Sequence, residues 1–248
     1  MKGLDKFKAH FAEAEAQYVL IGGAAAHLVL TDAGFDPRAT RDLDIVLCIE
    51  AIEPSFYGLL WQFIEAGGYS ARERASGKRE FYRFHKPTAD GYPKMLEIFS
   101  RKPDGATLPE GAVLTPVPDA DDILSLSAII LDDDYYALLQ AQNRTVDGVR
   151  VLNEKALIPF KARAHIDLRA RRDEGNEKVK EEDIAKHRSD VFRLAQLLPA
   201  NAAIELPATV SEDLANFLDL AASADALDTF GVEKDEAIAR LRRAYSTR

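Results

Sequence analysis

The stretch that most constrains the fold of this chain is residues 20–47, LIGGAAAHLVLTDAGFDPRATRDLDIVL. A short β-prone run, residues 18–21, ends abruptly at Gly22 and Gly23, and the helix-prone AAAHLVL follows. Glycines let a backbone approach an anion closely, and the N–H groups at a helix start point toward it. The sequence therefore predicts a strand, a tight glycine turn and a helix start suited to phosphate. A tight turn without any ligand is the alternative.

Two aspartates open the next apolar run. Asp42 and Asp44 lie two residues apart and lead into Ile-Val-Leu at 45–47. Residues i and i+2 of a strand point to the same side, so both carboxylates are expected to project together. Like charges repel unless a cation lies between them, and Mg²⁺ takes carboxylates together with substrate phosphates. The pair indicates a Mg²⁺ site, and a solvated turn before the strand is the alternative.

A third acid interrupts a later apolar run. Glu97 is the only charge within residues 95–99, MLEIF. A buried carboxylate without a partner is costly, so Glu97 either pairs with an Arg or Lys or faces a site. If its strand lies beside the strand of Asp42 and Asp44, three carboxylates converge. That is the arrangement expected for two-metal phosphoryl chemistry.

The glycine pair, RATRDLDIV at 38–46 and LEIF at 96–99 together resemble the core of the nucleotidyltransferase superfamily, which has the DNA polymerase β-like fold. More narrowly, they are similar to AbiEii-type toxin nucleotidyltransferase-like proteins. The resemblance implies an α+β protein, with a nucleotidyltransferase-fold mixed sheet and flanking helices followed by a helical C-terminal domain. It also implies Mg²⁺-dependent transfer of a nucleotide from an NTP to an acceptor hydroxyl on tRNA, protein or a small molecule.

The resemblance assigns roles to particular residues. The three acids would be catalytic and would hold the metal, and the two glycines would cradle the phosphates through their backbone N–H groups. The remaining candidates for nucleotide binding are Arg38, Thr40, Arg41 and Lys161. In AbiEii-like proteins an antitoxin partner is common, so a cognate antitoxin is implied by the resemblance alone.

Two positions depart from the family pattern. Ala24 follows the glycines where a hydroxyl residue is usual, and Glu97 stands where Asp is more frequent. The longer Glu side chain shifts the position of a metal ligand. These departures leave a second hypothesis open, in which the chain is a catalytically weak nucleotide-binding or regulatory module.

Two later segments extend the resemblance. Residues 152–171 and 181–198 look like the helices that carry the AbiEii-type lysine and K-D-x-x-D-L patterns. Lys161 matches the first lysine, which in such proteins is thought to reach the triphosphate. Secondary candidates come from the second pattern, with His187 standing where Asp is usual: Lys186, His187 and Asp190.

Each of these helical residues also has an ordinary structural interpretation. Lys161 lies off the apolar face formed by helical spacing, so it could be a solvated lysine. His187 falls on the apolar stripe of its helix, where a hydrogen-bonded core histidine is common. Lys186, Asp190 and Arg193 recur at helical spacing and could form a salt-bridged surface.

A basic segment lies between the two acidic strands. Residues 71–86, ARERASGKREFYRFHK, carry six Lys or Arg against two Glu. Ser76-Gly77 is a turn signal, so a basic hairpin is expected. Such a hairpin could receive a triphosphate or an RNA acceptor. A charged edge strand that discourages aggregation is the alternative.

The sequence predicts two domains, a nucleotidyltransferase-like core over 1–118 and a mainly helical domain over 119–248, with the active site in the cleft between them. The Pro- and Gly-rich segment 103–121 is the connector, and the strand-like run near 123–131 may still join the first sheet. An amphipathic helix is expected over residues 2–16.

Composition bounds the class of protein. The net charge of −9 argues against unspecific nucleic-acid binding. No apolar run approaches 18 residues, so no transmembrane helix is expected, and a membrane is not among the expected partners. The single cysteine, Cys48, excludes an intramolecular disulfide and fits a cytoplasmic protein.

Overall fold

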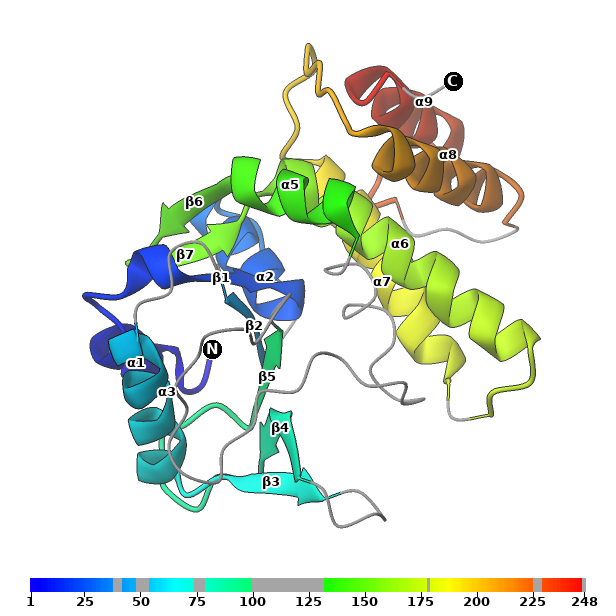
Figure 1. Cartoon of the computed structure of the whole chain (residues 1–248). Helices are drawn as coiled ribbons and strands as arrows, with labels where there is room; N and C mark the ends of the chain where they lie inside the picture. Colours follow the sequence, from blue (N-terminus) through cyan, green and yellow to red (C-terminus); the bar gives the residue numbers. More distant parts are fainter. Residues whose placement is uncertain are drawn as a thin grey trace. The chain divides into compact units, whose positions relative to one another are not determined.

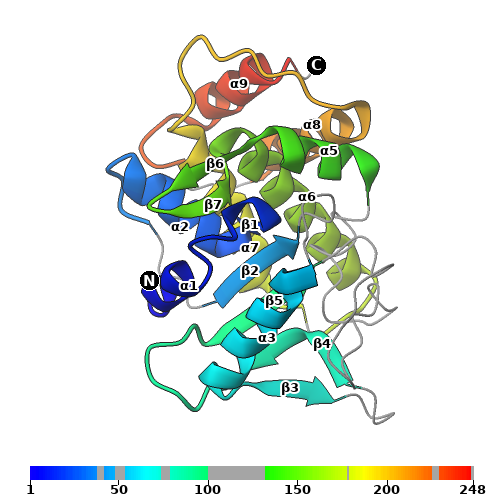
Figure 2. The ribbon, with the colours of Figure 1, turned by 60° about the vertical axis from the view of Figure 1, so that its left-hand side comes forward.

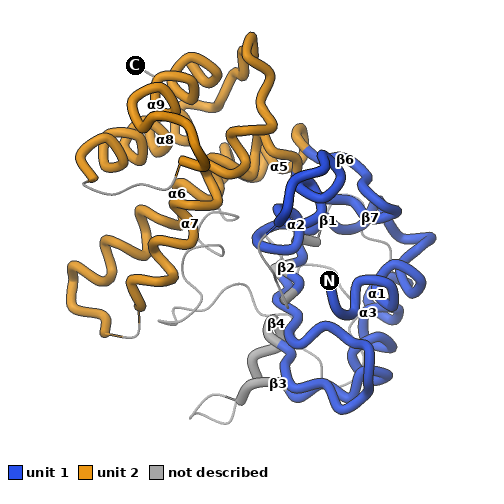
Figure 3. Tube along the Cα trace, turned by 180° about the vertical axis from the view of Figure 1, so that it is seen from behind, with its two compact units in different colours: residues 1–119, 143–152 blue, residues 120–142, 153–248 orange. Residues whose placement is uncertain are grey.

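The computed structural model describes most of the chain. The described residues are 1–37, 42–47, 54–73, 79–99, 132–177, 179–224 and 229–246. The chain forms two compact units, which Figure 3 distinguishes by colour. Unit 1 comprises residues 1–119 and 143–152, and unit 2 comprises 120–142 and 153–248.

Unit 1 contains all the strands that the structure describes, together with the helices that pack on them (Figure 1). They are α1 Leu4–His10, a 3₁₀ helix Glu15–Gln17, β1 Tyr18–Ile21, α2 Gly22–Asp32, β2 Asp42–Leu47, α3 Pro54–Gly67, β3 Ser70–Glu73, β4 Arg79–His85, β5 Met95–Phe99, β6 Asn143–Val146 and β7 Val149–Leu152. Unit 2 is helical throughout the part that the structure describes. Its helices are α5 Asp133–Ala141, α6 Glu154–Asp173, α7 Glu181–Ala195, α8 Ala208–Ala222 and α9 Lys234–Ala244.

The strands of unit 1 form one mixed sheet in the order β3-β4-β5-β2-β1-β7-β6 (Figure 2). β1 pairs antiparallel with β2 and parallel with β7, and β2 pairs parallel with β5. The expected α+β architecture, a mixed sheet followed by a helical part, is confirmed. Among the described residues, no helix is both long enough and apolar enough to span a bilayer.

Aromatic packing covers one face of this sheet. The ring of Tyr18 on β1 meets Phe7 of α1 edge-on at 5.1 Å and Phe11 at 6.0 Å between centroids. Phe63 of α3 joins the same cluster, 5.8 Å from Phe7. Edge-to-face pairs of this kind add to the stability that area burial supplies. α1 and α3 therefore cover the face to which Tyr18 belongs.

α2 covers the other face of the sheet. It contacts β1, β2, β6 and β7, and Figures 1 and 3 show it on the side of the sheet away from α1 and α3. All four residues of β1 are fully buried, as expected for a strand packed on both faces. The alanines at 24–26 are buried too, and their small side chains let α2 lie close to the strands.

Two expectations are wrong in detail. The predicted helix over 2–16 ends at His10, and a turn and a 3₁₀ helix redirect the chain into β1 while Phe11 and Ala14 stay buried. Residues 143–152 belong to unit 1, whereas a boundary after residue 118 placed them in the helical domain. The reason is β-pairing, because β7 lies parallel to β1 with Leu20 opposite Val151.

α6 begins after an N-cap residue and contains an internal proline. The side chain of Asn153 accepts a hydrogen bond from the Lys155 N–H at 3.0 Å, as an N-cap does. Pro159 has no N–H, so the carbonyl oxygen of Lys155, four residues earlier, lacks its usual helical donor. The hydroxyl of Tyr245 donates to that oxygen at 3.0 Å. The residue that caps the end of α9 thus replaces the missing donor of α6.

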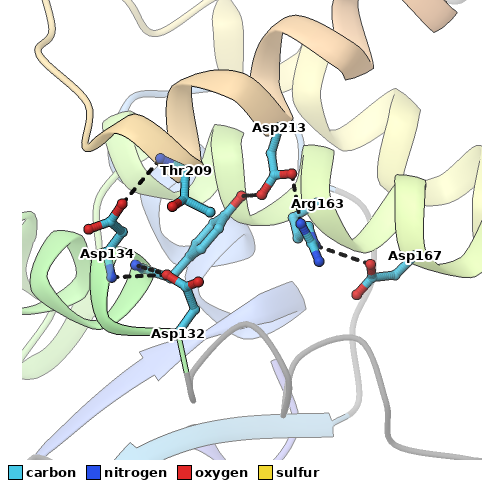
Figure 4. A network of polar contacts seen from close by, with 7 residues as sticks. Asp132, Asp134, Arg163, Asp167, Thr209 and Asp213 are labelled. Atoms are coloured by element: carbon cyan, nitrogen blue, oxygen red, sulfur yellow. Dashed lines mark hydrogen bonds and ion pairs between the residues drawn. The ribbon is translucent and has the colours of Figure 1, made fainter.

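A polar network joins α5, α6 and α8 within unit 2 (Figure 4). Asp213 accepts from the Tyr135 hydroxyl at 2.9 Å and from Arg163 at 2.7 Å. Arg163 also pairs with Asp167, whose carboxyl pKa is raised by burial. At the start of α5, Asp132 accepts from backbone N–H groups of its first turn. Because each of these acids has a donor, burial of the network is compatible with stability.

Candidate functional site

Three strands bring the predicted acidic positions into one row. β2 lies between β1 and β5, with Asp44 opposite Ile21 on one side and opposite Glu97 on the other. Asp42 lies opposite Met95 in the same register. The prediction that the strand of Glu97 is adjacent to the strand of the two aspartates is therefore confirmed.

The register also assigns these positions to a face. Leu43 and Ile45 of β2 are buried at 0% and 1% exposure, and their partners Leu96 and Ile98 are buried as well. Because side chains alternate along a strand, these residues and Tyr18 belong to the face covered by α1 and α3. Positions 42, 44 and 97 belong to the opposite face, on which α2 packs. The row therefore shares a face with the helix that follows the glycine pair.

The glycine turn lies at the end of this row. Gly22 follows directly after Ile21, the backbone partner of Asp44, and begins α2 with φ of +62°. Side chains rarely adopt a positive φ, so a glycine is required where the strand turns sharply into the helix. Gly23 continues the first helical turn. The first N–H groups of a helix have no acceptor within the helix, and a helix start is a common anion site.

Several predicted residues fall outside the described part of the chain. Arg38, Thr40 and Arg41 precede β2 in this range, so their expected role in nucleotide binding stays a prediction. For Asp42 and Asp44 the structure describes the backbone but not the side chains. Among the described side chains, which do not include those of these two aspartates, no group of three His, Cys, Asp or Glu could hold a metal.

Glu97 is half-buried on β5, and its neighbours along the strand are buried. We expect Glu97→Gln to reduce Mg²⁺-dependent nucleotide transfer and to leave the metal-free protein no less stable, because the substitution relieves the repulsion between Glu97 and the two aspartates. Urea unfolding without metal and a transfer assay on the same variant check both parts. A clear loss of stability with full activity would remove Glu97 from the site.

A second candidate site lies between α6 and α7, within unit 2. Nζ of Lys161 is 2.8 Å from Oδ2 of Asp190, and the side chains are only 4% and 7% exposed. The interpretation of Lys161 as a solvated lysine is therefore wrong. So is the interpretation of Lys186, Asp190 and Arg193 as a salt-bridged surface, because Asp190 is buried. The spacing of residues along α6 does not reveal that Lys161 is buried, since its burial comes from α7 packing against α6.

His187 lies one turn before Asp190 on α7. Its Nδ1 is buried and has no hydrogen-bond partner among the described residues, so the expected hydrogen-bonded core histidine is not what the structure shows. Burial lowers the pKa of His187 well below its ordinary value, and the cations of Lys161 and Lys186 lower it further. Asp190 acts in the opposite direction. The neutral imidazole is therefore the stable form in the folded protein.

Sequence reasoning did not single out His165. It is 2% exposed, lies four residues after Lys161 on α6, and its Nδ1 is 2.9 Å from the carbonyl oxygen of Ile184 on α7. A carbonyl only accepts, so Nδ1 carries the proton. Burial lowers the pKa of His165, although this hydrogen bond raises it. His165 follows Lys161 by four residues, which places both side chains on one face of the helix. This spacing is the sequence feature from which His165 could have been predicted to lie near Lys161.

The expected basic hairpin is present in the backbone. β3 pairs antiparallel with β4, and β4 pairs antiparallel with β5, so the hairpin extends the sheet beyond Glu97. Residues 74–78, and the side chains of 71–73 and 79–83, lie outside the described part. Its role toward a triphosphate or RNA therefore stays a prediction.

Comparisons with known proteins give distant structural matches. No protein-family model matches the chain, and no curated protein matches it in sequence. An antigenic nucleotidyltransferase-like protein from Paracoccidioides brasiliensis aligns over 96% of this chain and 94% of its own, with 16% identity and a TM-score of 0.46. The antibiotic-resistance factor ANT(2'')-Ia aligns over 90% and 96%, with 17% identity and a TM-score of 0.36. JHP933 from Helicobacter pylori aligns over 96% and 85%, with 14% identity and a TM-score of 0.30.

TM-scores below 0.5 do not establish a common fold by themselves. The residues of this chain and the register of its strands are what define the candidate site.

Proposed function

We propose that this protein is a Mg²⁺-dependent nucleotidyltransferase that moves a nucleoside monophosphate from an NTP to an acceptor hydroxyl. The observation that carries the proposal is the cross-strand row. It aligns Glu97, Asp44 and the residue before Gly22 on three neighbouring strands. An acidic pair, a third acid and a glycine-led helix start meet at one place, although they are separated by up to 75 residues of sequence (97 − 22).

The residues of the row fit Mg²⁺ by their chemistry. Asp42, Asp44 and Glu97 offer carboxylate oxygens, the hard ligands that this ion prefers, and triphosphate oxygens would complete its coordination. Bound there, Mg²⁺ would neutralise charge on the phosphates as the pyrophosphate leaves. Gly22 and Gly23 would hold the phosphates by their backbone, and Glu97 would accept the proton of the acceptor hydroxyl.

Two cations are candidates for the leaving pyrophosphate. Arg41, next to Asp42 in sequence, would act from the loop before the acids. The role of Lys161 rests only on the resemblance to AbiEii-type proteins, and its ammonium group already has Asp190 as a partner. Arg41 is therefore the cation that we favour, with Arg38 and Thr40 as further contacts. The secondary candidates for the nucleotide site, which the same resemblance implies, are Lys186, His187 and Asp190.

The acceptor is proposed only as a class: tRNA, a protein or a small molecule. A toxin role, a cognate antitoxin partner and a cytoplasmic location are further proposals, supported by the resemblance and by the single cysteine. Incubating the protein and Mg²⁺ with each α-³²P-labelled NTP, with and without total tRNA, tests the class. Label on RNA, on protein or on a small molecule distinguishes the three acceptors.

Ligand binding provides a second test. Without metal, repulsion among the three acids should destabilise the site. Mg²⁺ together with the correct NTP should therefore raise the melting temperature, because a ligand that binds only the folded state stabilises it by mass action. At a ligand concentration of 100 Kd the gain is about 2.7 kcal/mol. Differential scanning fluorimetry with each NTP, with EDTA in place of Mg²⁺ as control, measures it. No shift at millimolar concentrations of any NTP would argue against a nucleotide site.

One alternative has a specific observation in its favour. Ala24, buried in the first turn of α2, lacks the hydroxyl that the family pattern has there. A nucleotide-binding module without turnover would show the thermal shift but no label transfer to any acceptor.

A further inference from the structure

We propose that the α6–α7 pair is an acid-sensitive device, which opens when the imidazole of His187 takes up a proton. The proposal concerns unit 2 and does not depend on nucleotide chemistry. It rests on three contacts between the two helices: the Lys161–Asp190 ion pair, the unpartnered Nδ1 of His187 and the hydrogen bond from His165 to Ile184.

The first step concerns charge balance. Within the packed pair, one buried cation, Lys161, faces one buried anion, Asp190. A proton on His187 would add a second positive charge to this pair. His187 as a residue is half-buried with its Nδ1 shielded from solvent, so two cations would then face one carboxylate, which is unfavourable because a charge shielded from water requires its own partner.

The second step concerns hydrogen bonding. Protonated imidazole donates from both ring nitrogens. The Nδ1 of His187 is buried and meets no acceptor among the described residues. A proton placed there would therefore form an N–H group without an acceptor, whereas the same group in the unfolded chain bonds to water. His165 is 2% exposed and already donates its Nδ1–H to Ile184, so its protonation would place a further charge inside the packed pair. Its ring is packed edge-on against Phe217 of α8, 5.3 Å between centroids.

The surrounding charges favour the neutral ring. From α6, Lys161 and His165 face His187, and on α7 itself Lys186 and Asp190 are its electrostatic neighbours. α9 also packs on α7, and its Arg240 donates to the carbonyl oxygen of Leu198, beyond the end of α7. Of these neighbours of His187 only Asp190 favours a proton, and it is already paired with Lys161.

The direction of the pH effect follows from these contacts. Both histidines have a folded-state pKa below the unfolded value of about 6.5, so the unfolded helices bind more protons. The stability of the pair is therefore complete above pH 6.5 and decreases as the pH falls below it. Opening would release Lys161 and Asp190 from each other and expose both to solvent.

Amide hydrogen exchange of the full chain at pH 7.5, 6.5 and 5.5, corrected for intrinsic exchange, tests the device. For wild-type peptides from α6 and α7, the opening equilibrium should increase up to about 30-fold between pH 6.5 and 5.5, about five- to sixfold for each histidine. Glutamine in His187→Gln cannot be protonated, so this variant should limit the increase to about five- to sixfold, the share of His165. His27→Gln, at the half-exposed histidine of α2, is the matched control and should behave as wild type.

Two results would overturn the proposal. One is an equal pH dependence in wild type and in His187→Gln. The other comes from wild-type protein alone, and so holds even if the variant fails to fold. If an NMR titration shows His187 gaining its proton near pH 6.5 while α6 and α7 keep their exchange protection, protonation does not open the pair.

Discussion

Asp44→Asn is expected to reduce nucleotide transfer at least about 100-fold while the protein stays folded. Asp44 lies in the middle strand of the row, with Glu97 on one side and Ile21, which leads into Gly22, on the other. Loss of a metal-holding carboxylate removes several kcal/mol of transition-state stabilisation, and each 1.36 kcal/mol corresponds to a tenfold change in rate. Initial rates of label transfer from the preferred NTP, with circular dichroism as the folding check, measure it. Asp42→Asn should behave in the same way.

Asp147→Asn is the matched control for this substitution. Asp147 lies in the turn between β6 and β7 at φ of +49°, a conformation that asparagine also tolerates, and its partner is Lys8 at 2.7 Å. It is exposed in the same unit, far in sequence from the row, so the rate should equal that of the wild type. A well-folded Asp44→Asn protein with an unchanged rate would refute the catalytic assignment of the two aspartates.

Asp190→Asn is expected to destabilise the helical unit by about 3–5 kcal/mol, because it leaves the buried ammonium of Lys161 without a counter-charge. Chemical denaturation at pH 8 measures the free energy of unfolding. Lys161→Met should cost a similar amount by leaving the carboxylate alone. The double variant should cost clearly less than the sum of the two, because the charges are removed together.

An exposed pair on the same helix provides the comparison. Arg169 and Asp173 of α6 are 48% and 72% exposed and 3.9 Å apart. Exposed ion pairs contribute about 0–1 kcal/mol, so Asp173→Asn should change the stability little. If Asp190→Asn were equally mild, Lys161 would not be held in a buried pair. Such a result would favour a contact of Lys161 with a triphosphate over a role of the Lys161–Asp190 pair in holding α6 against α7.

Local patterns predicted much of the first unit. The run 18–21, the glycine pair and the alternation after Asp42 each indicate their own element, and the structure has β1, α2 and β2 at these places. The sequence also points to Glu97, because a lone charge in an apolar run requires an explanation. Its strand then paired with β2 as expected. These predictions held because side-chain periodicity and glycine turns are properties of the adjacent residues alone.

Contacts between distant segments of the chain account for the features that local sequence patterns did not predict. The hairpin of β6 and β7 looked like part of the helical domain by its position in the chain, yet β7 pairs with β1, more than 120 residues earlier (149 − 21 = 128). Lys161 lies off the apolar stripe of α6, and only the packing of α7 buries it beside Asp190.

Residue patterns alone identify the elements of the candidate site: an acidic pair on a strand, a third acid on another strand and a glycine turn before a helix. The tertiary structure decided which of them meet, placing β2 between β1 and β5 with Asp44 opposite Glu97. It also decided that Lys161, Asp190 and His187 are packed between two helices. The physical reason is that hydrogen-bond register and helix packing depend on residues far apart in the chain, whereas propensity and periodicity depend on neighbours.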